Sequence, residues 1–197
     1  MKNKKIKKGE YGYLAYQKKK EIIKTIVFFA ISLSIYAGAY LISGKKDNIG
    51  TVIAMLGMLP ASKSFVSMVM FFRFKTGNKD VYDKVKEAVL DMPVFYDAVI
   101  TTSQKSYPVN AFCCCDGNLC GFTDDEKTDV KIIEKHLKEM LKNNGIKGVN
   151  AKLFTTLDAY ITRIQDIGEK RNEEPELDED GFTKDQKAIA LVSSLSL

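Results

Sequence analysis

The sequence predicts a two-span α-helical membrane hairpin followed by a small α/β (α+β) cytoplasmic domain, with the element order α-β-β-β-α-β-α. Two apolar segments crowd into residues 25–72 of the 197-residue chain, and the last 120 residues have the mixed composition of a soluble domain. Helical and strand periodicities alternate through that domain. This distribution excludes a fully disordered chain, a disulfide-dense scaffold and a wholly soluble enzyme.

The basic residues concentrate at the N-terminus, in residues 1–24. That segment contains nine lysines and two glutamates, whereas the remainder of the chain contains 21 basic and 23 acidic residues. A basic segment before an apolar one favours contact with anionic lipid headgroups, and Tyr11, Tyr13 and Tyr16 fit that position. It does not suit a nucleic-acid-binding domain, which carries its basic surplus on the folded part. The alternative is a solvated tail over residues 1–10.

Residues 25–43 form the first predicted membrane span. They are nineteen residues without a charge, and a helix of that length is roughly 28 Å long, about one hydrocarbon core. The alternative is a secretory signal peptide, because Ala37-Gly38-Ala39 resembles a small-residue cleavage site. The long basic region before this segment and the second apolar segment after it favour a retained span.

Residues 49–72 form the second predicted span, which Pro60 and Lys63 interrupt. Proline removes a backbone donor and tends to kink a helix, although membrane helices tolerate it. Lys63 lies close enough to the cytoplasmic edge for its side chain to snorkel there. Two alternatives stay open: Lys63 faces a pore or a binding site, or residues 65–72 turn into an interfacial helix.

The charges that flank the spans predict the orientation of the hairpin. Lysines precede the first span, the connecting turn has only Lys45 and Lys46, and five basic residues follow the second span: Arg73, Lys75, Lys79, Lys84 and Lys86. The positive-inside rule therefore places both termini in the cytoplasm.

The second span carries the motif LPASK, Leu59 to Lys63. With the basic N-terminus and the two-span hairpin, this motif resembles uncharacterised two-pass membrane proteins of low-GC Gram-positive bacteria. The resemblance covers residues 1–75 and implies a location in the bacterial plasma membrane. It implies no catalytic residues, because that group has no established activity.

The cytoplasmic domain is expected over residues 78–168. Three helices are predicted by apolar residues at three-to-four spacing, at residues 78–92, 128–143 and 157–171. Four strands are predicted by β-branched and aromatic runs, at residues 94–100, 107–115, 119–122 and 149–155. Residues 169–180 contain seven acidic side chains and read as a linker, before a last helix within 181–197.

The same order of elements occurs in the core of restriction-endonuclease-like folds. That core needs an aspartate and a Glu/Asp-x-Lys on adjacent strands, so that carboxylates hold Mg²⁺. Here Asp97 and Asp116 are isolated and no Glu-x-Lys is present on the central hairpin. A nuclease or another hydrolase tethered to the membrane is therefore only an alternative, and fold alone does not decide it.

The most unusual local feature is the group Cys113, Cys114, Cys115 and Cys120. Strand alternation puts Cys113 and Cys115 on one face and Cys114 on the other. A turn at Asp116-Gly117 places Cys113 opposite Cys120, whereas a turn at Gly117-Asn118 places Cys115 there instead.

Small buried apolar cysteines are the simplest interpretation of this group, and a redox, acylation or metal role is the alternative. The spacing of a structural zinc site is missing. The only histidine, His136, lies beside the apolar face of its helix and is expected on the solvated surface. A disulfide is disfavoured in a reducing cytoplasm.

These observations predict an integral membrane protein whose cytoplasmic domain binds another protein or acts as a scaffold, without catalysis and without a cofactor. Self-association of the hairpin fits its small size, although we identify no clear small-xxx-small face in it. The alternatives are the nuclease-like or hydrolytic domain and a cysteine-based redox or metal sensor.

Overall fold

A computed structural model describes residues 5–44, 49–89, 92–103, 105–170 and 181–197 of the chain. The structure divides into two compact units. The first is a helical hairpin over Leu14–Lys75. The second, called the sheet domain below, combines Thr76–Leu197 with the N-terminal segment up to Tyr13. The part of the chain up to Tyr13 thus belongs to the sheet domain and the part from Leu14 to the hairpin, whereas the sequence indicated one separate basic segment over residues 1–24.

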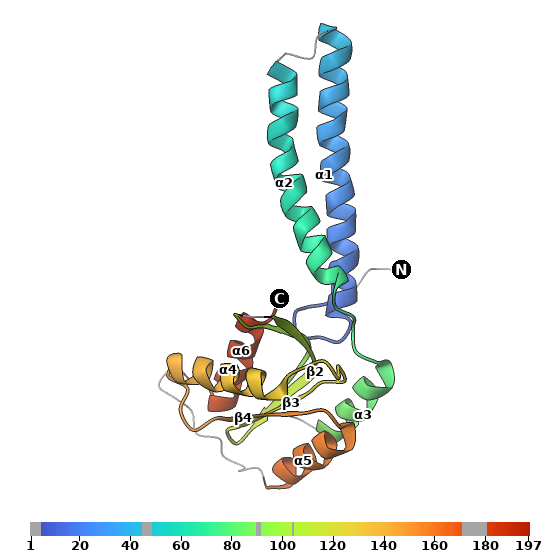
Figure 1. The fold of residues 1–197 in the computed structure, drawn as a ribbon. Coiled ribbons are helices and arrows are strands. Elements are labelled where there is room, and N and C mark those ends of the chain that lie inside the picture. Colours follow the sequence, from blue (N-terminus) through green and yellow to red (C-terminus); the bar gives the residue numbers. More distant parts are fainter. Residues whose placement is uncertain (1–4, 45–48, 90–91, 104, 171–180) are drawn as a thin grey trace. The chain divides into compact units, whose positions relative to one another are not determined.

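The hairpin consists of two helices, α1 (Tyr13–Ser43) and α2 (Ile49–Phe72), which run side by side (Figure 1). Both are long and apolar enough to cross a membrane. Large apolar side chains such as Leu41, Met55 and Leu59 are exposed on them. The helix α1 begins well before the predicted span, because its first turns lack glycine and proline and are rich in good helix formers.

Small side chains form the contact between α1 and α2. Ala54, Ala61 and Ser64 are buried on α2. A Cβ atom added at Gly57 would lie 2.8 Å from Oγ of Ser32 on α1. The expectation that the hairpin has no small-xxx-small face is therefore wrong, because Gly57 and Ala61 are four residues apart and belong to this contact. Such residues allow two helix backbones to approach closely.

The described part of the sheet domain contains one mixed four-stranded sheet and four helices. The strands, in their order across the sheet, are β1 (Val94–Thr101), β2 (Ser106–Cys115), β3 (Asn118–Phe122) and β4 (Asn150–Phe154). The first three are antiparallel neighbours, and β4 is parallel to β3. The helices are α3 (Lys79–Val89), α4 (Val130–Asn143), α5 (Leu157–Glu169) and α6 (Lys184–Leu195).

The helices cover both faces of the sheet and make three layers (Figure 1). On one face, α4 and α6 pack against the sheet through side chains such as Leu137 and Val192. On the other face, α3 and α5 contribute Val85 and Ile164. Each face therefore has its own apolar core, and successive residues of β2 from Ala111 to Cys115 supply the two cores in turn, as the strand period requires.

The alternation of side chains between the two faces of the sheet changes at Asp97, whose φ is 52°. Phe95 and Ala98 are three residues apart, as are Val109 and Phe112, yet both pairs belong to the core under α4 and α6. Residues three apart in a regular strand point to opposite faces. The left-handed backbone at Asp97 thus reverses which face of the sheet each side chain after it occupies. The register of β1 against β2 continues past Asp97.

Segments from both ends of the chain cover the outer edge of β1. The backbone N–H of Tyr96 donates to the carbonyl of Gly9 at 2.8 Å, and the N–H of Leu197 donates to the carbonyl of Val99 at 3.2 Å. Residue 9 therefore pairs with the sheet, which differs from the solvated tail considered for residues 1–10. Unpaired edge strands attract other chains, so these contacts protect the edge.

Candidate functional site

The turn between β2 and β3 brings two cysteines opposite each other. Asp116 and Gly117 have positive φ angles of 48° and 71°, as the central residues of a type I′ turn require. This is the first of the two registers considered from the sequence, and it pairs Cys113 with Cys120. Directly opposed residues have Cβ atoms about 4.5–5.5 Å apart, so the two sulfur atoms lie within reach of each other.

A thioether lies beside one of these two thiols. The Sγ atom of Cys113 lies 4.0 Å from the Sδ atom of Met92, in the segment between α3 and β1. Met92 is 7% exposed, and Cys113 and Cys120 are each 3% exposed. We call Met92, Cys113 and Cys120 the sulfur cluster. The sequence pointed to the cysteines alone, because nothing in the spacing of Met92 marks it as their neighbour.

A tyrosine hydroxyl lies in the same core as the sulfur cluster. Tyr160 of α5 is fully buried, and its hydroxyl oxygen has no hydrogen-bond partner among the described residues. Burial raises the pKa of Tyr160 well above its ordinary value, and Cys113 and Cys120 raise it further. A buried hydroxyl without a partner is costly, so this core has unused hydrogen-bonding capacity.

A positive charge lies beside one of the thiols. Burial raises the pKa of Cys120, and the hydrogen-bonded guanidinium of Arg163 and the ammonium of Lys152 partly offset that rise. The thiol is therefore protonated at neutral pH and is a poor nucleophile. The Arg163 side chain would nevertheless compensate negative charge on the cluster if the thiols lost their protons.

Cys114 has a different environment, because it lies on the opposite face of β2. Its thiol donates to the carboxylate of Asp185 at 3.3 Å, and the same carboxylate accepts the backbone N–H groups of Asp116 and Gly117, each at 2.9 Å. Burial and then the charge of Asp185 raise the pKa of Cys114. Asp185 therefore fastens α6 to the β2–β3 turn, and Cys114 is a structural contact.

The structure does not bring all four cysteines into one site. Cys115 shares the face of Cys113 but pairs with Asn118 at the turn, and Cys114 is separated from both by the sheet. Within the described ranges, no group of three or more His, Cys, Asp and Glu side chains is arranged to hold a metal ion. A zinc site of four such ligands thus finds no support in this region.

His136 lies on α4 and differs from its expected place on the solvated surface. It is half-buried, and its Nε2 atom is buried with no hydrogen-bond partner in the part of the chain that the structure describes. The reason is its position three residues after Ile133 and one before Leu137, both of which are in the core. The imidazole therefore lies at the flank of the packed face.

One carboxylate holds the two chain segments that connect the sheet domain with the hairpin. The side chain of Asp97, only 3% exposed, accepts the N–H of Gly12 at 2.8 Å and that of Gly77 at 3.3 Å. Tyr11 adds to this, because its hydroxyl donates to the carbonyl of Gly77 at 3.0 Å and its ring stacks on Tyr82 at 4.4 Å. We call Asp97 with Gly12 and Gly77 the Asp97 clamp.

The Asp97 clamp bears on the nuclease alternative. Asp97 lies opposite residue 110 of β2, and Asp116 lies in the turn six residues further on. At about 3.3 Å per residue the two carboxylates are separated by roughly 20 Å along the strand. Carboxylates that share a metal ion lie much closer together, so the two are not a pair of ligands.

Pro60 and Lys63 of α2 lie on the side of the helix that does not face α1. Both are exposed, whereas Ala61 and Ser64 beside them are buried in the helix contact. The helix continues through Pro60 and reaches Phe72, so no break separates residues 65–72 from the rest. Lys63 therefore does not point into the contact between α1 and α2.

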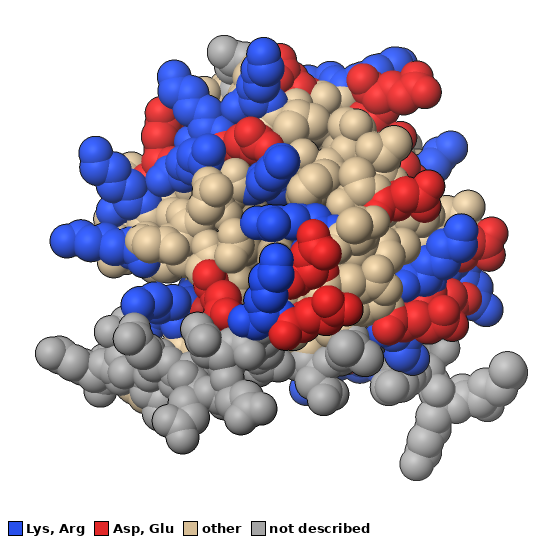
Figure 2. Space-filling model, turned by 90° about the horizontal axis from the view of Figure 1, so that it is seen from below, with Lys and Arg blue, Asp and Glu red and all other residues tan. Residues whose placement is uncertain are grey.

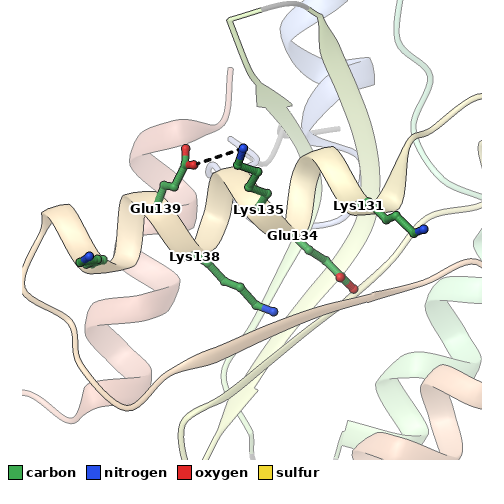
Figure 3. A pocket seen from close by; sticks show the side chains of 6 residues that line it. Lys131, Glu134, Lys135, Lys138 and Glu139 are labelled. Atoms are coloured by element: carbon green, nitrogen blue, oxygen red, sulfur yellow. Dashed lines mark ion pairs between the residues drawn. The ribbon is translucent and has the colours of Figure 1, made fainter.

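A shallow hollow of about 360 Å³ follows the outer side of α4 (Figure 3). Glu134 and Glu139 in this hollow are engaged, since Oε1 of Glu134 accepts the N–H of Leu153 at 2.8 Å and Glu139 pairs with Lys135 at 4.0 Å. For the other three lysines of the hollow, no described carboxylate lies within ion-pair distance: Lys131, Lys138 and Lys142.

On one face of the molecule the charges are evenly mixed (Figure 2). Figure 2 shows a face of the molecule on which basic and acidic side chains of the described residues are interspersed. Such a surface attracts neither polyanions nor polycations strongly. The lysines of α4 are thus a local basic strip.

Comparisons with known proteins give no further assignment. No protein-family model matches the chain, and searches of the curated proteins and of the solved structures found no match either.

Proposed function

We propose that this chain is a two-span protein of a bacterial plasma membrane that presents the sheet domain in the cytoplasm as a non-catalytic interaction module. The observation that carries this proposal is the Asp97 clamp. Gly12 directly precedes α1 and Gly77 follows α2 by five residues, and one buried carboxylate binds both. Within the sheet domain, the two chain segments that lead into and out of the hairpin are therefore both held by one side chain of β1.

Two further features support this proposal. The apolar side chains exposed along α1 and α2 suit contact with lipid, and the lysines that flank these helices favour a cytoplasmic domain. The basic strip of α4 supplies a surface for a partner. Charge complementarity favours a protein with an acidic surface, because acidic side chains would pair with Lys131, Lys138 and Lys142.

Photo-crosslinking in living cells tests the interaction. A photoreactive phenylalanine replaces Lys138 in the strip, and the matched control replaces Asp166, which is exposed on α5 in the opposite layer. We expect a discrete protein adduct at position 138 that disappears when Lys131 and Lys142 are both changed to Glu. An equal adduct at position 166, or an adduct that survives the charge reversal, would contradict the proposed surface.

A further inference from the structure

The sulfur cluster has the composition of a site for a soft metal ion. It contains two thiols and one thioether, all buried, with the Cys113 and Met92 sulfur atoms 4.0 Å apart and Cys113 directly opposite Cys120. Thiolate and thioether ligands select soft ions, of which Cu(I) is the one that also accepts Met. We infer that Met92, Cys113 and Cys120 form a binding site for Cu(I).

The charges of the site balance when Cu(I) binds. The ion bonds to the sulfur atoms of Cys113 and Cys120, both thiol protons pass to solvent, and the thioether of Met92 binds as a neutral ligand. No electron is transferred, because copper remains Cu(I) throughout. Two thiolates and one monovalent cation leave a single negative charge, which the guanidinium of Arg163 beside Cys120 compensates.

The hydroxyl of Tyr160 belongs to the core that surrounds the sulfur cluster. It lies fully buried in the same core without a described partner. A thiol is a weak acceptor, whereas a metal-bound thiolate is a stronger one. A hydroxyl in the surrounding core can then orient such a ligand through an outer hydrogen bond.

Zinc fits the same residues less well. It takes four ligands, usually thiolates or imidazoles, and no group of three His, Cys, Asp or Glu side chains in the described residues is arranged for it. Cys115 is the nearest further thiol on this face, but it lies about 7 Å along the strand from Cys113. A small set of soft ligands thus favours Cu(I), which accepts lower coordination numbers.

The test uses the full chain in detergent, titrated anaerobically with Cu(I) in competition with a chromogenic chelator. We expect one Cu(I) per chain with only sulfur ligands by X-ray absorption. Cys113→Ala and Cys120→Ala should each weaken binding by at least about 100-fold, which exceeds the loss from outer partners. Cys114→Ala, on the opposite face of the same strand, should leave the affinity unchanged.

Two milder variants keep the test decisive if a cysteine variant fails to fold. Met92→Leu preserves volume and removes only the thioether, and Arg163→Gln removes the compensating charge together with the guanidinium that donates to Asn118. We expect each to weaken Cu(I) binding by about 10–100-fold. Three results would overturn the inference. They are an unchanged Cu(I) affinity in both variants, an equal loss of affinity in Cys114→Ala, and a chain that never takes Cu(I) from the chelator.

Discussion

The carboxylate of Asp97 accepts the backbone N–H of Gly12 at 2.8 Å, and its other oxygen accepts that of Gly77 at 3.3 Å. Asp97 has a left-handed backbone, which few residues other than Gly, Asn and Asp adopt readily. A single position in β1 therefore sets the turn of the strand and fastens both connections to the hairpin.

Replacement of Asp97 tests the clamp. Asp97→Ala removes two charge-assisted hydrogen bonds and strains the backbone, so the unfolding free energy of the full chain should fall by about 3 kcal/mol or more. Asp97→Asn keeps one acceptor oxygen and tolerates positive φ, and it should cost about half as much. Thermal unfolding in detergent, followed by circular dichroism, measures both. Equal costs for the two variants would contradict the clamp.

A pair of glycines tests the β2–β3 turn. Gly117 and Gly145 have nearly the same φ, 71° and 72°, but a Cβ at Gly117 would lie 2.6 Å from the carbonyl oxygen of Gly148, whereas a Cβ at Gly145 would meet nothing within 4 Å. Gly145→Ala should cost about 1–2 kcal/mol from backbone strain alone. Gly117→Ala should cost clearly more in the same unfolding measurement. If the two costs match, the turn is looser than described.

A designed disulfide tests the packing of the hairpin. A Cβ at Gly57 would lie 3.6 Å from Cβ of Ser32, within the range of Cβ distances in disulfides. The double variant Ser32→Cys/Gly57→Cys should therefore form a disulfide on mild oxidation, seen as protection of two thiols from a maleimide gel-shift reagent after denaturation. The control pairs Gly57→Cys with Ser34→Cys on the exposed side of α1. Efficient bonding in the control would show that α1 and α2 pack otherwise.

The sheet domain should lose stability in alkali. The pKa values of Cys114, Cys120 and Tyr160 are raised, and burial raises that of Tyr96 to about 12. In the unfolded chain these thiols and phenols ionise near their ordinary values of 9.0 and 10.0. At alkaline pH the unfolded state then binds fewer protons than the folded state. The stabilisation that these buried groups contribute is therefore complete below about pH 9 and is lost progressively towards pH 12.

Unfolding at a series of pH values measures this loss. Each group contributes a slope of up to about 1.4 kcal/mol per pH unit. Tyr160→Phe removes one such group and also a buried hydroxyl without a described partner, so it should flatten the profile without destabilising the chain at pH 7. A profile that stays level from pH 9 to 11 would contradict the burial of these groups.

Much of the sheet domain follows from local sequence patterns. Asp116-Gly117 between apolar runs predicts a tight hairpin, and the structure has that turn with Cys113 opposite Cys120. The helix over 128–143 has a strong apolar face, and its N-cap, Asp129, accepts the N–H groups of Lys131 and Ile132.

Other features depend on contacts between residues far apart in the sequence, and the local periodicity of apolar residues gives no information about such contacts. The clamp joins Gly12, Gly77 and Asp97 across 85 positions. Met92 comes next to Cys113 only when β1 pairs with β2. The small-residue contact of the hairpin was missed because Gly57 and Ala61 form one face only together with Ala54 and Ser64, at alternating spacings of three and four.

The orientation of the hairpin is the property that most directly tests a two-span protein with a cytoplasmic domain. Alkaline phosphatase is fused after Gly44, directly behind α1, or after Leu197, and a fluorescent protein is fused after Leu197 in a parallel strain of a bacterial host. We predict phosphatase activity only for the fusion at Gly44 and fluorescence for the fusion at Leu197, with the chain retained in carbonate-washed membranes. Phosphatase activity at Leu197, or release of the chain by carbonate, would contradict a two-span protein with a cytoplasmic domain.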